Sequence, residues 1–292
     1  MSHHFLMTAA SHYDVRYQIN PWMRPDAWRA DPTIRRAAAH KASAQLRAAL
    51  QETGAVVDTM SGVAGLPDLV FPANAAVVLD GCVLLARFRY SQRQGEESVF
   101  QAAFEALKTR GLVDEIVRLP RGVLQEGAGD CIWDATRDFF WVGYGQRSTQ
   151  DSVAVIEQVF GQKTVALELA TDRFYHLDTC FCPMTGGKLL YYPPAFTAEA
   201  LVAIHAHVRP EDRIVASDEE AAAFCVNAVN IGRRLIMAEP PQSLREKLRA
   251  QGFTVKGIDL APFILSGGGA YCMTLRLDRC SSAAADALCA AE

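Results

Sequence analysis

Three kinds of side chain in this sequence could carry out chemistry together: a thiol, an imidazole and carboxylates. Cys272 follows a glycine triplet, residues 267–269, and precedes an apolar run, so it lies on a short loop that a substrate could approach. His176 and Asp178 form an isolated His-x-Asp pair, and Glu126 opens a Glu-Gly-x-Gly-Asp turn. A thiol nucleophile, a proton-transfer group and acids that attract a cation are typical of covalent hydrolysis at a cationic carbon.

Each of these residues also has a purely structural interpretation. Cys272 could be a buried strand cysteine, because a free cysteine behaves as a small hydrophobic residue. His176 could be a structural histidine, and Glu126 could be a simple loop acid. If the segment from His176 to Asp178 is extended, however, both side chains project to one face. The carboxylate could then orient the imidazole or receive a cation.

Further polar residues in loop-like segments are candidates for substrate binding. They are Asn20, Asp68, Asn74, Arg93 and Arg147. Each one taken alone is a weak candidate, because Asn and Asp are common in turns and most arginines lie on the surface. They become informative only if the fold brings them to one place.

The composition is that of a globular protein without a strong charge preference. The 292 residues are 50% hydrophobic, and 29 Lys and Arg stand against 33 Asp and Glu for a net charge of -4. No basic stripe is present, so nucleic acid is not an expected partner. The N-terminus has no basic segment followed by an apolar one, and no run reaches the roughly 18 apolar residues of a membrane span. We therefore expect a cytoplasmic protein without membrane contact, and assembly as a homo-oligomer stays open.

A hairpin pattern recurs along the chain at intervals of roughly 50 residues, which indicates internal repetition. In the first copy the dipeptide Asp80-Gly81 separates two apolar runs and predicts a type I′ turn. The predicted hairpins cover residues 75–88, 131–142, 180–192 and 224–237. Helical patterns lie at residues 34–51, 97–110, 151–160, 197–207 and 242–251, and short apolar runs follow them.

The repeating unit is therefore strand, strand, helix and strand. A fifth unit could be built jointly by residues 6–7 near the N-terminus and by the final apolar strand, residues 272–277. Pairing these two segments would close a ring and remove exposed sheet edges. In such a ring the loops at one end converge near the axis, so residues distant in sequence can meet there. An open α/β sandwich of two halves is the competing arrangement.

Blocks of sequence along almost the whole chain resemble the guanidine-modifying pentein superfamily, and most of all its bacterial arginine dihydrolase branch. They include residues 19–23 (INPWM), 67–71 (PDLVF), 93–97 (RQGEE), 126–130 (EGAGD), 174–183, 225–230 (CVNAVN) and 267–277. Arginine deiminases and dimethylarginine dimethylaminohydrolases are related branches. The resemblance implies an α/β fold, a five-bladed propeller of ββαβ repeats that forms one guanidine-hydrolase domain over residues 1–292.

By this resemblance Cys272 is the nucleophile and His176 is the general acid and base. Glu126 and Asp178 are the carboxylates that hold a guanidinium. The chemistry agrees, because a guanidinium is a planar cation with five donors that carboxylates recognise in pairs. The resemblance implies no cofactor and no metal, and the sequence has no Cys/His cluster of metal-binding type.

The substrate-binding residues are implied in the same way. Arg147 and Arg93 would face the α-carboxylate of an amino acid, while Asp68 and Asn20 would take its α-amino group or remaining nitrogen donors. The expected partner is a small molecule, arginine or a methylated arginine.

Asn74 separates the branches. The related deiminases and dimethylarginine hydrolases place an acid at this position, whereas the dihydrolase branch carries Asn. An amide can donate to the neutral oxygen of a ureido group, which a carboxylate would repel, so Asn74 favours a second hydrolysis. We therefore expect an arginine hydrolase that releases ornithine, ammonia and carbon dioxide. A citrulline-forming arginine deiminase and a dimethylarginine dimethylaminohydrolase are the nearest alternatives; an amidinotransferase and a catalytically silent binding protein are more distant ones.

Overall fold

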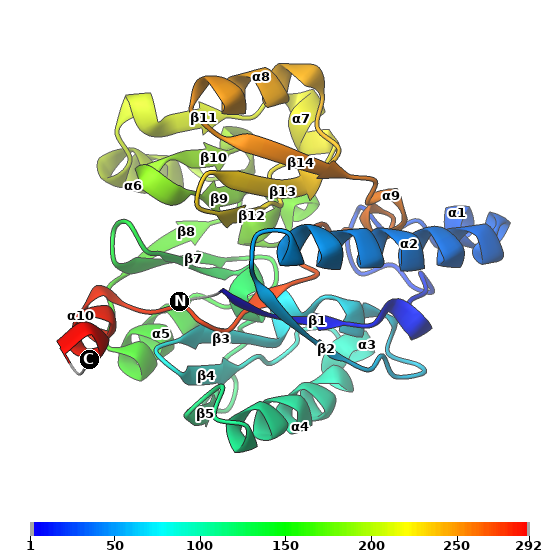
Figure 1. Cartoon of the computed structure of the whole chain (residues 1–292), viewed down its shortest axis with the longest axis horizontal. Coiled ribbons are helices and arrows are strands. Elements are labelled where there is room, and N and C mark those ends of the chain that lie inside the picture. Colours follow the sequence, from blue (N-terminus) through cyan, green and yellow to red (C-terminus); the bar gives the residue numbers. More distant parts are fainter. Residues whose placement is uncertain (1–2, 291–292) are drawn as a thin grey trace.

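Five three-stranded sheets make up the fold, and all of them are built in the same way (Figure 1). The computed structural model describes residues 3–290, with side chains up to residue 286. In every sheet the first strand runs antiparallel to the second, and the second runs parallel to the third. A helix joins each parallel pair, because parallel neighbours need a crossover connection. This arrangement confirms the α/β fold of five ββαβ units.

Four of the sheets follow the chain in order. The second sheet contains β3 (Ala76–Leu79), β4 (Cys82–Leu85), α4 (Glu96–Thr109) and β5 (Glu115–Arg118); the third contains β6 (Cys131–Asp134), β7 (Phe139–Tyr144), α5 (Ser152–Phe160) and β8 (Thr164–Glu168). The fourth contains β9 (Phe181–Pro183), β10 (Leu189–Tyr191), α6 (Ala198–His207) and β11 (Arg213–Val215); the fifth contains β12 (Val229–Ile231), β13 (Arg234–Ala238), α8 (Gln242–Ala250) and β14 (Thr254–Ile258). Shorter helices are α1 (Pro25–Ala30), α3 (Ser91–Gln94), α7 (Asp218–Ala222), α9 (Ala261–Ile264) and α10 (Ser282–Ala290).

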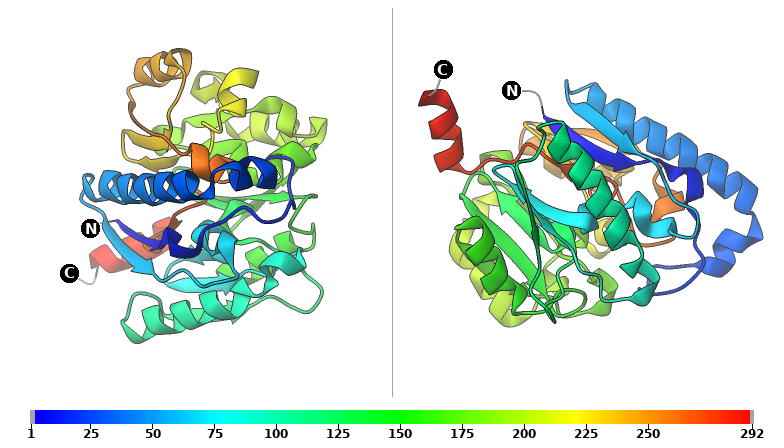
Figure 2. Two further views of the ribbon diagram at one scale, coloured as in Figure 1. Left: turned by 90° about the vertical axis from the view of Figure 1, so that its right-hand side faces the viewer. Right: turned by 90° about the horizontal axis from the view of Figure 1, so that it is seen from below.

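The remaining sheet joins the two ends of the chain. It contains β15 (Leu275–Arg276), β1 (His4–Thr8), α2 (Pro32–Gln51) and β2 (Val56–Met60). β15 lies antiparallel to β1, with Leu6 opposite Leu275. Figure 2 shows both ends of the chain on the same side of the molecule. The predicted closure of the ring by residues 6–7 and the final strand is therefore confirmed, and the open sandwich is excluded.

Local sequence explains most of these elements. In α2, Pro32 occupies the first turn and the Asp31 carboxylate caps the helix by accepting a hydrogen bond from the Ile34 N–H at 3.2 Å. In the first hairpin Asp80 and Gly81 have φ values of 51° and 73°, the left-handed pair that a type I′ turn requires. The five predicted helices begin and end within two residues of the predicted bounds.

Several predicted strands are shorter than expected, and two of these differences bear on the site. The run 224–230 forms a strand only from Val229 onward, because Phe224 adopts a left-handed φ of 60° and starts a turn. The final strand is reduced to Leu275–Arg276, and the residues before it form a turn around Cys272. Both deviations leave loop residues, rather than strand residues, next to the site described below. No helix in the described part of the chain is long and apolar enough to cross a membrane.

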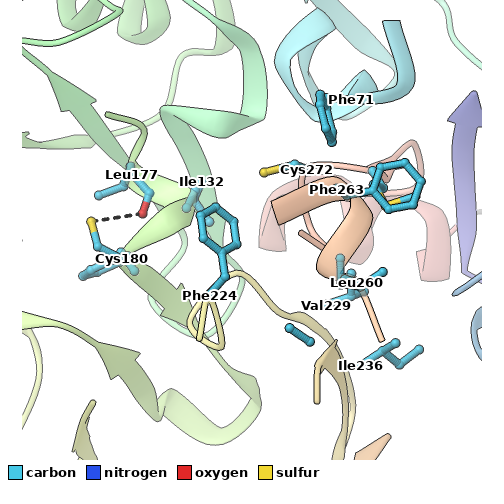
Figure 3. Packing of buried hydrophobic residues seen from close by; sticks show 14 of the residues in the cluster. Phe71, Ile132, Leu177, Cys180, Phe224, Val229, Ile236, Leu260, Phe263 and Cys272 are labelled. Carbon is cyan, nitrogen blue, oxygen red and sulfur yellow. Dashed lines mark hydrogen bonds between the residues drawn. The ribbon is translucent and has the colours of Figure 1, made fainter. Parts of the chain in front are cut away.

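A cluster of buried aromatic and aliphatic side chains surrounds Cys272 (Figure 3). Phe71 and Phe263 meet edge to face, with ring centroids 6.3 Å apart, and Phe224 belongs to the same cluster. These rings keep water away from the thiol and hold the loop that carries it.

Candidate active site

The predicted site residues lie in loops that lead into the inner strands of the sheets. Asn74 precedes β3, Glu126 precedes β6, His176 and Asp178 precede β9, and Cys272 precedes β15. The inner strand is the first strand of each repeating unit, so these loops converge at one end of the ring. The structure thus brings together residues that are up to 198 positions apart, from 74 to 272. The convergence expected from a closed ring is present.

Cys272 lies between an acid and an amide. Its Sγ is 3.2 Å from Asp178 Oδ2 and 3.1 Å from Asn227 Nδ2. The side-chain oxygen of Asn227, Oδ1, accepts hydrogen bonds from the backbone N–H groups of Tyr271 and Cys272, at 3.0 and 3.2 Å. Burial and the Asp178 carboxylate raise the pKa of the Cys272 thiol well above its usual value. The sulfur is therefore protonated in this state, and its S–H donates to Asp178.

The glycine triplet before Cys272 allows close packing within the protein, and Gly268 also lines the cavity next to Cys272. A Cβ on Gly268 would come within 2.1 Å of the Phe71 ring, and a Cβ on Gly269 within 2.7 Å of Asn227 Oδ1. Gly267 has a φ of +83° and its carbonyl accepts the Tyr175 hydroxyl at 2.6 Å. These glycines allow protein side chains to pack against the loop, so they hold Cys272 in place rather than make it flexible.

His176 lies between two carboxylates. Its Nε2 is 3.1 Å from Glu126 Oε2, and its Nδ1 is 3.0 Å from Asp130 Oδ2; both are ion-pair distances with angles outside hydrogen-bond geometry. Burial alone would lower the pKa of His176, but Asp130 and Glu126 raise it to about 9. The imidazole is therefore charged at neutral pH. His176 is extended, but residues 177–179 form a 3₁₀ turn, so the condition of an extended segment through Asp178 is not met.

Glu126 is neutralised by a second cation. Arg147 Nη1 lies 3.1 Å from Glu126 Oε2, and Arg147 Nη2 donates to the Ile19 carbonyl at 3.0 Å. The guanidinium stacks between the rings of Tyr90 and Tyr175, at 4.7 and 4.6 Å. Burial would raise the pKa of Glu126, but Arg147 and His176 hold it well below its usual range. Glu126 is therefore an anion in a completely buried position.

Arg93 fixes the orientation of Asn74. The guanidinium donates to Glu96 through Nε at 3.0 Å and Nη2 at 2.8 Å, and its Nη1 donates to Asn74 Oδ1 at 2.8 Å. Arginine only donates, so the amide oxygen must face Arg93 and the amide nitrogen must face away. That nitrogen points to Gly129, where an added Cβ would come within 2.3 Å of it and 3.4 Å of His176 Nδ1.

Several polar atoms of the site are buried without a hydrogen-bond partner in the described structure. They are Asp68 Oδ1, Asn74 Nδ2 and Asp178 Oδ1; the ring nitrogens of His176 have the Glu126 and Asp130 carboxylates as ion-pair partners. Such atoms are rare in folded proteins and costly, so a concentration of them calls for a ligand. Burial raises the pKa of Asp68, and raises that of Asp178 to about 7 against the opposing charge of His176.

The predicted substrate-binding residues line one small cavity. Asn20, Asp68, Asn74, Arg93 and Arg147 surround a space of about 10 Å³ together with Cys272. The Asn20 side chain is held within the protein: one N–H of Nδ2 donates to the Ser266 carbonyl, and Oδ1 accepts from the N–H groups of Trp22 and Met23. A cavity of this size is at the lower limit of about 10 to 15 Å³ that holds one water molecule, so side chains must move before a substrate can bind.

Sequence reasoning missed Asp130, Asn227 and Tyr175. Asp130 ends the same Glu-Gly-x-Gly-Asp turn that pointed to Glu126, and in the structure it also accepts the Leu177 N–H and the Ser148 hydroxyl, at 3.0 and 2.6 Å. The turn alone could have drawn attention to it. Nothing in the sequence distinguishes Asn227 from any other loop amide. Within the described residues, no group of three His, Cys, Asp or Glu side chains is placed to hold a metal ion.

The five ββαβ sheets and the buried thiol, imidazole and carboxylates at one end of their ring are those of the guanidine-modifying pentein superfamily. Within it, residues 16–279 match the family profile described as N,N dimethylarginine dimethylhydrolase, eukaryotic, and the chain belongs to this family. A dimethylarginine dimethylaminohydrolase of Mycobacterium tuberculosis is 32% identical over 94% of this chain and 85% of its own length.

Other relatives carry a different activity in their names. A bifunctional arginine dihydrolase/ornithine cyclodeaminase, ArgZ, of Synechocystis is 42% identical over 93% of this chain. This chain covers only 37% of that relative's length. A crystal structure of the N-terminal domain of ArgZ, a cysteine-to-serine variant bound to substrate, has a TM-score of 0.88, with 39% identity over 96% of this chain and 99% of the domain. An asparagine-to-serine variant of the same domain, covalently bonded to a reaction intermediate, is equally similar.

Proposed function

We propose that the protein hydrolyses free arginine to ornithine, ammonia and carbon dioxide through a covalent intermediate on Cys272. The observation that carries this proposal is the Asn74 amide, whose Nδ2 is a buried donor without a partner beside His176. The similarity to ArgZ over most of this chain supports it. We also propose that residues 1–292 act as one catalytic domain. A cytoplasmic location fits as well, because the described cysteines are all free and the nucleophile has to stay reduced.

The guanidinium would bind at the carboxylates. Asp178 Oδ1 and Asp68 Oδ1 are buried acceptors without partners, so they can receive N–H donors of an amino acid that enters the cavity. In this arrangement Asp178 and Glu126 hold the guanidinium, and Asp68, with Asn20 beside it, receives the α-amino group. Glu126 becomes free for the substrate only when Arg147 releases it, since Arg147 now occupies it at 3.1 Å.

The two arginines would then take the α-carboxylate. Arg147 keeps its stacking between Tyr90 and Tyr175 and exchanges Glu126 for the substrate's carboxylate. Arg93 uses four of its five N–H groups on Glu96, Asn74 and the Asp68 carbonyl, which leaves one N–H of Nη1 for the substrate. Arg93 thus both contacts the substrate and holds Asn74.

The first hydrolysis follows from the charges. The bound guanidinium cation lowers the pKa of the Cys272 thiol, whose proton passes to Asp178 Oδ2 at 3.2 Å. The thiolate attacks the guanidino carbon, and ammonia leaves with the proton of the charged His176. The neutral imidazole then takes a proton from water, whose oxygen attacks the same carbon. The C–S bond breaks with its electron pair on sulfur, which is again a thiolate, the new O–H gives its proton to solvent, and the neutral ureido product remains bound.

The second hydrolysis repeats these steps on the ureido carbon. Asn74 Nδ2 donates to the ureido oxygen, which keeps the neutral product bound and its carbon electrophilic. Thiolate attack releases a second ammonia and leaves a thiocarbamate, and water converts this to a carbamate that loses carbon dioxide. Overall, one arginine and two waters give one ornithine, two ammonia and one carbon dioxide.

Product analysis tests this proposal. Purified protein is incubated with arginine, and the amino acids are separated by chromatography while ammonia is counted. Ornithine with two ammonia for each arginine supports the dihydrolase. Citrulline with one ammonia would assign the protein as a deiminase instead.

A second candidate is hydrolysis of dimethylarginine, because the family match and the mycobacterial relative carry that name. The same assay with asymmetric dimethylarginine separates the two. Dimethylamine released faster than ammonia from arginine would favour this candidate.

A further inference from the structure

A second, larger cavity reaches Asp178. It has a volume of about 180 Å³, and residues of the inner strands β6, β9, β12 and β15 form its walls. Tyr271 and Asp178 line it, but none of the substrate-binding residues discussed above does. The cavity therefore lies along the axis of the ring, next to the nucleophile's neighbours and separate from the arginine pocket.

One cation in the cavity wall has no carboxylate within ion-pair distance among the described residues. Arg276 is neutralised by Asp278, with two hydrogen bonds of 3.0 Å, and Asp134 is neutralised by Arg137 at 2.6 Å. Arg279, in contrast, forms no ion pair with a carboxylate in the described part of the chain; it contacts the Trp133 carbonyl at 3.4 Å and the Tyr271 side chain. Burial and the charge of Arg276 lower the pKa of Arg279, although it stays protonated. A half-buried guanidinium without a counterion favours an anion.

A second donor in the wall is also unused. Trp133 lines the cavity and is 3% exposed, and its indole N–H has no acceptor in the described structure. A buried N–H without an acceptor costs free energy, which a ligand oxygen could recover. Arg279 and Trp133 both donate, so the polar part of the ligand has to accept.

The rest of the wall is apolar. Ile132, Phe181 and Met184 are buried hydrophobic residues that line the same cavity. Its volume of about 180 Å³ exceeds the ~150 Å³ of an engineered apolar cavity that binds benzene, so a ligand of about six non-hydrogen atoms fits. An inorganic anion would satisfy the donors but leave the apolar wall uncovered, whereas a short aliphatic carboxylate would do both.

We infer that this axial cavity is a binding site for a small aliphatic carboxylate, with the carboxylate on Arg279 and Trp133 and the aliphatic part against Phe181 and Met184. The ligand also acts on the reaction, because Asp178 lines the axial cavity and contacts Cys272, which lines the arginine pocket. A negative charge in the axial cavity makes ionised Asp178 less stable, and Asp178 lies 3.2 Å from the Cys272 sulfur. Binding of a guanidinium is weakened, so the carboxylate raises KM for arginine.

The binding test uses butyrate as the probe and the full-length wild-type protein, with inorganic phosphate as the comparison. Titration calorimetry should detect the binding of butyrate, and the binding of phosphate should be weaker or absent. Arg279→Gln should weaken butyrate binding about tenfold or more, and Trp133→Phe about threefold, because they remove a charged and a neutral donor. Arg121→Gln, an exposed arginine far from the cavity lining, should leave binding unchanged. Trp133→Phe keeps the test valid if Arg279→Gln does not fold.

If butyrate does not bind, or if both variants bind it as tightly as the wild type, the proposed binding site in the axial cavity is overturned. Phosphate binding as tight as butyrate overturns the assignment of an aliphatic carboxylate. The kinetic effect rests on the proposed function, whereas calorimetry needs no turnover, so the failure of one is distinguishable from the failure of the other. In the wild type, KM for arginine should rise with butyrate concentration and reach a plateau. In Arg279→Gln, the same butyrate concentrations should change KM only weakly. A KM that rises without limit, equally in both proteins, places butyrate in the arginine pocket and overturns the coupling.

Discussion

The Asn74→Asp substitution is the sharpest test of the site, because it changes one amide to a carboxylate of the same shape. One oxygen of the new side chain keeps the 2.8 Å contact with Arg93 and becomes a charge-assisted bond. The other takes the place of Nδ2, the unpaired buried donor beside Gly129. The first hydrolysis should survive, because a guanidinium tolerates a further carboxylate.

The second hydrolysis should fail. The neutral ureido oxygen would face a carboxylate oxygen instead of an N–H, at a cost of about 1 to 3 kcal/mol for an unsatisfied buried group. This corresponds to about 5- to 150-fold in the partition between release and further hydrolysis. The product should shift from ornithine towards citrulline, which chromatography of the amino acids measures directly.

Asn74→Ala is the matched control, because it removes the donor without adding a charge. It should shift the product in the same direction but less than Asn74→Asp does. An unchanged ratio of ornithine to citrulline in Asn74→Asp would refute the role of the amide. Citrulline as the end product of the wild type would refute the dihydrolase assignment itself.

The other predictions concern the thiol and the imidazole. Cys272→Ser should abolish turnover while the thermal unfolding midpoint stays close to wild type, because a hydroxyl is a much weaker nucleophile of similar volume; substantial residual activity would contradict a covalent mechanism. His176→Ala should lower kcat by about 10² to 10⁴, with a smaller change in arginine binding measured by calorimetry. The pH profile of kcat/KM should fall below about 7, where Asp178 becomes protonated, and above about 9, where His176 loses its proton. Asp130→Asn should move the alkaline limb to lower pH, because it removes the nearest charge that raises the pKa of His176; an unmoved limb would assign that limb to another group.

Much of the fold could be predicted because its signals are local. The period of apolar residues and Pro32 mark α2, and Asp80-Gly81 marks the first hairpin. Closure of the ring followed from counting repeats, since four units left two unpaired strands. The strand expected from residue 224 failed because Phe224 has a left-handed backbone conformation that no apolar run reveals.

The site could be predicted only in part. Residue type alone singled out Cys272 and His176, and the resemblance gave the roles of the rest, which stay predictions. The contacts made by Asn227 and Asp130 depend on packing between different sheets, so no spacing in the sequence encodes them. The glycines before Cys272 pointed to the right loop, but not to the close packing that they also allow there. Their partners, the Phe71 ring and Asn227, lie far away in the sequence.

The pairing of β1 with β15 determines when the ring can close during synthesis and folding. β1 and its neighbour Leu275–Arg276 are far apart in the sequence, so during synthesis β1 leaves the ribosome long before its partner strand. The edge of β1 therefore has to wait for the C-terminal strand, and the loop with Cys272 is placed only when that strand docks. A chain interrupted before this strand can neither pair β1 with β15 nor position the Cys272 thiol. Activity thus requires translation through Leu275–Arg276, and a chain that ends before this strand is inert as well as prone to aggregate at its open edge.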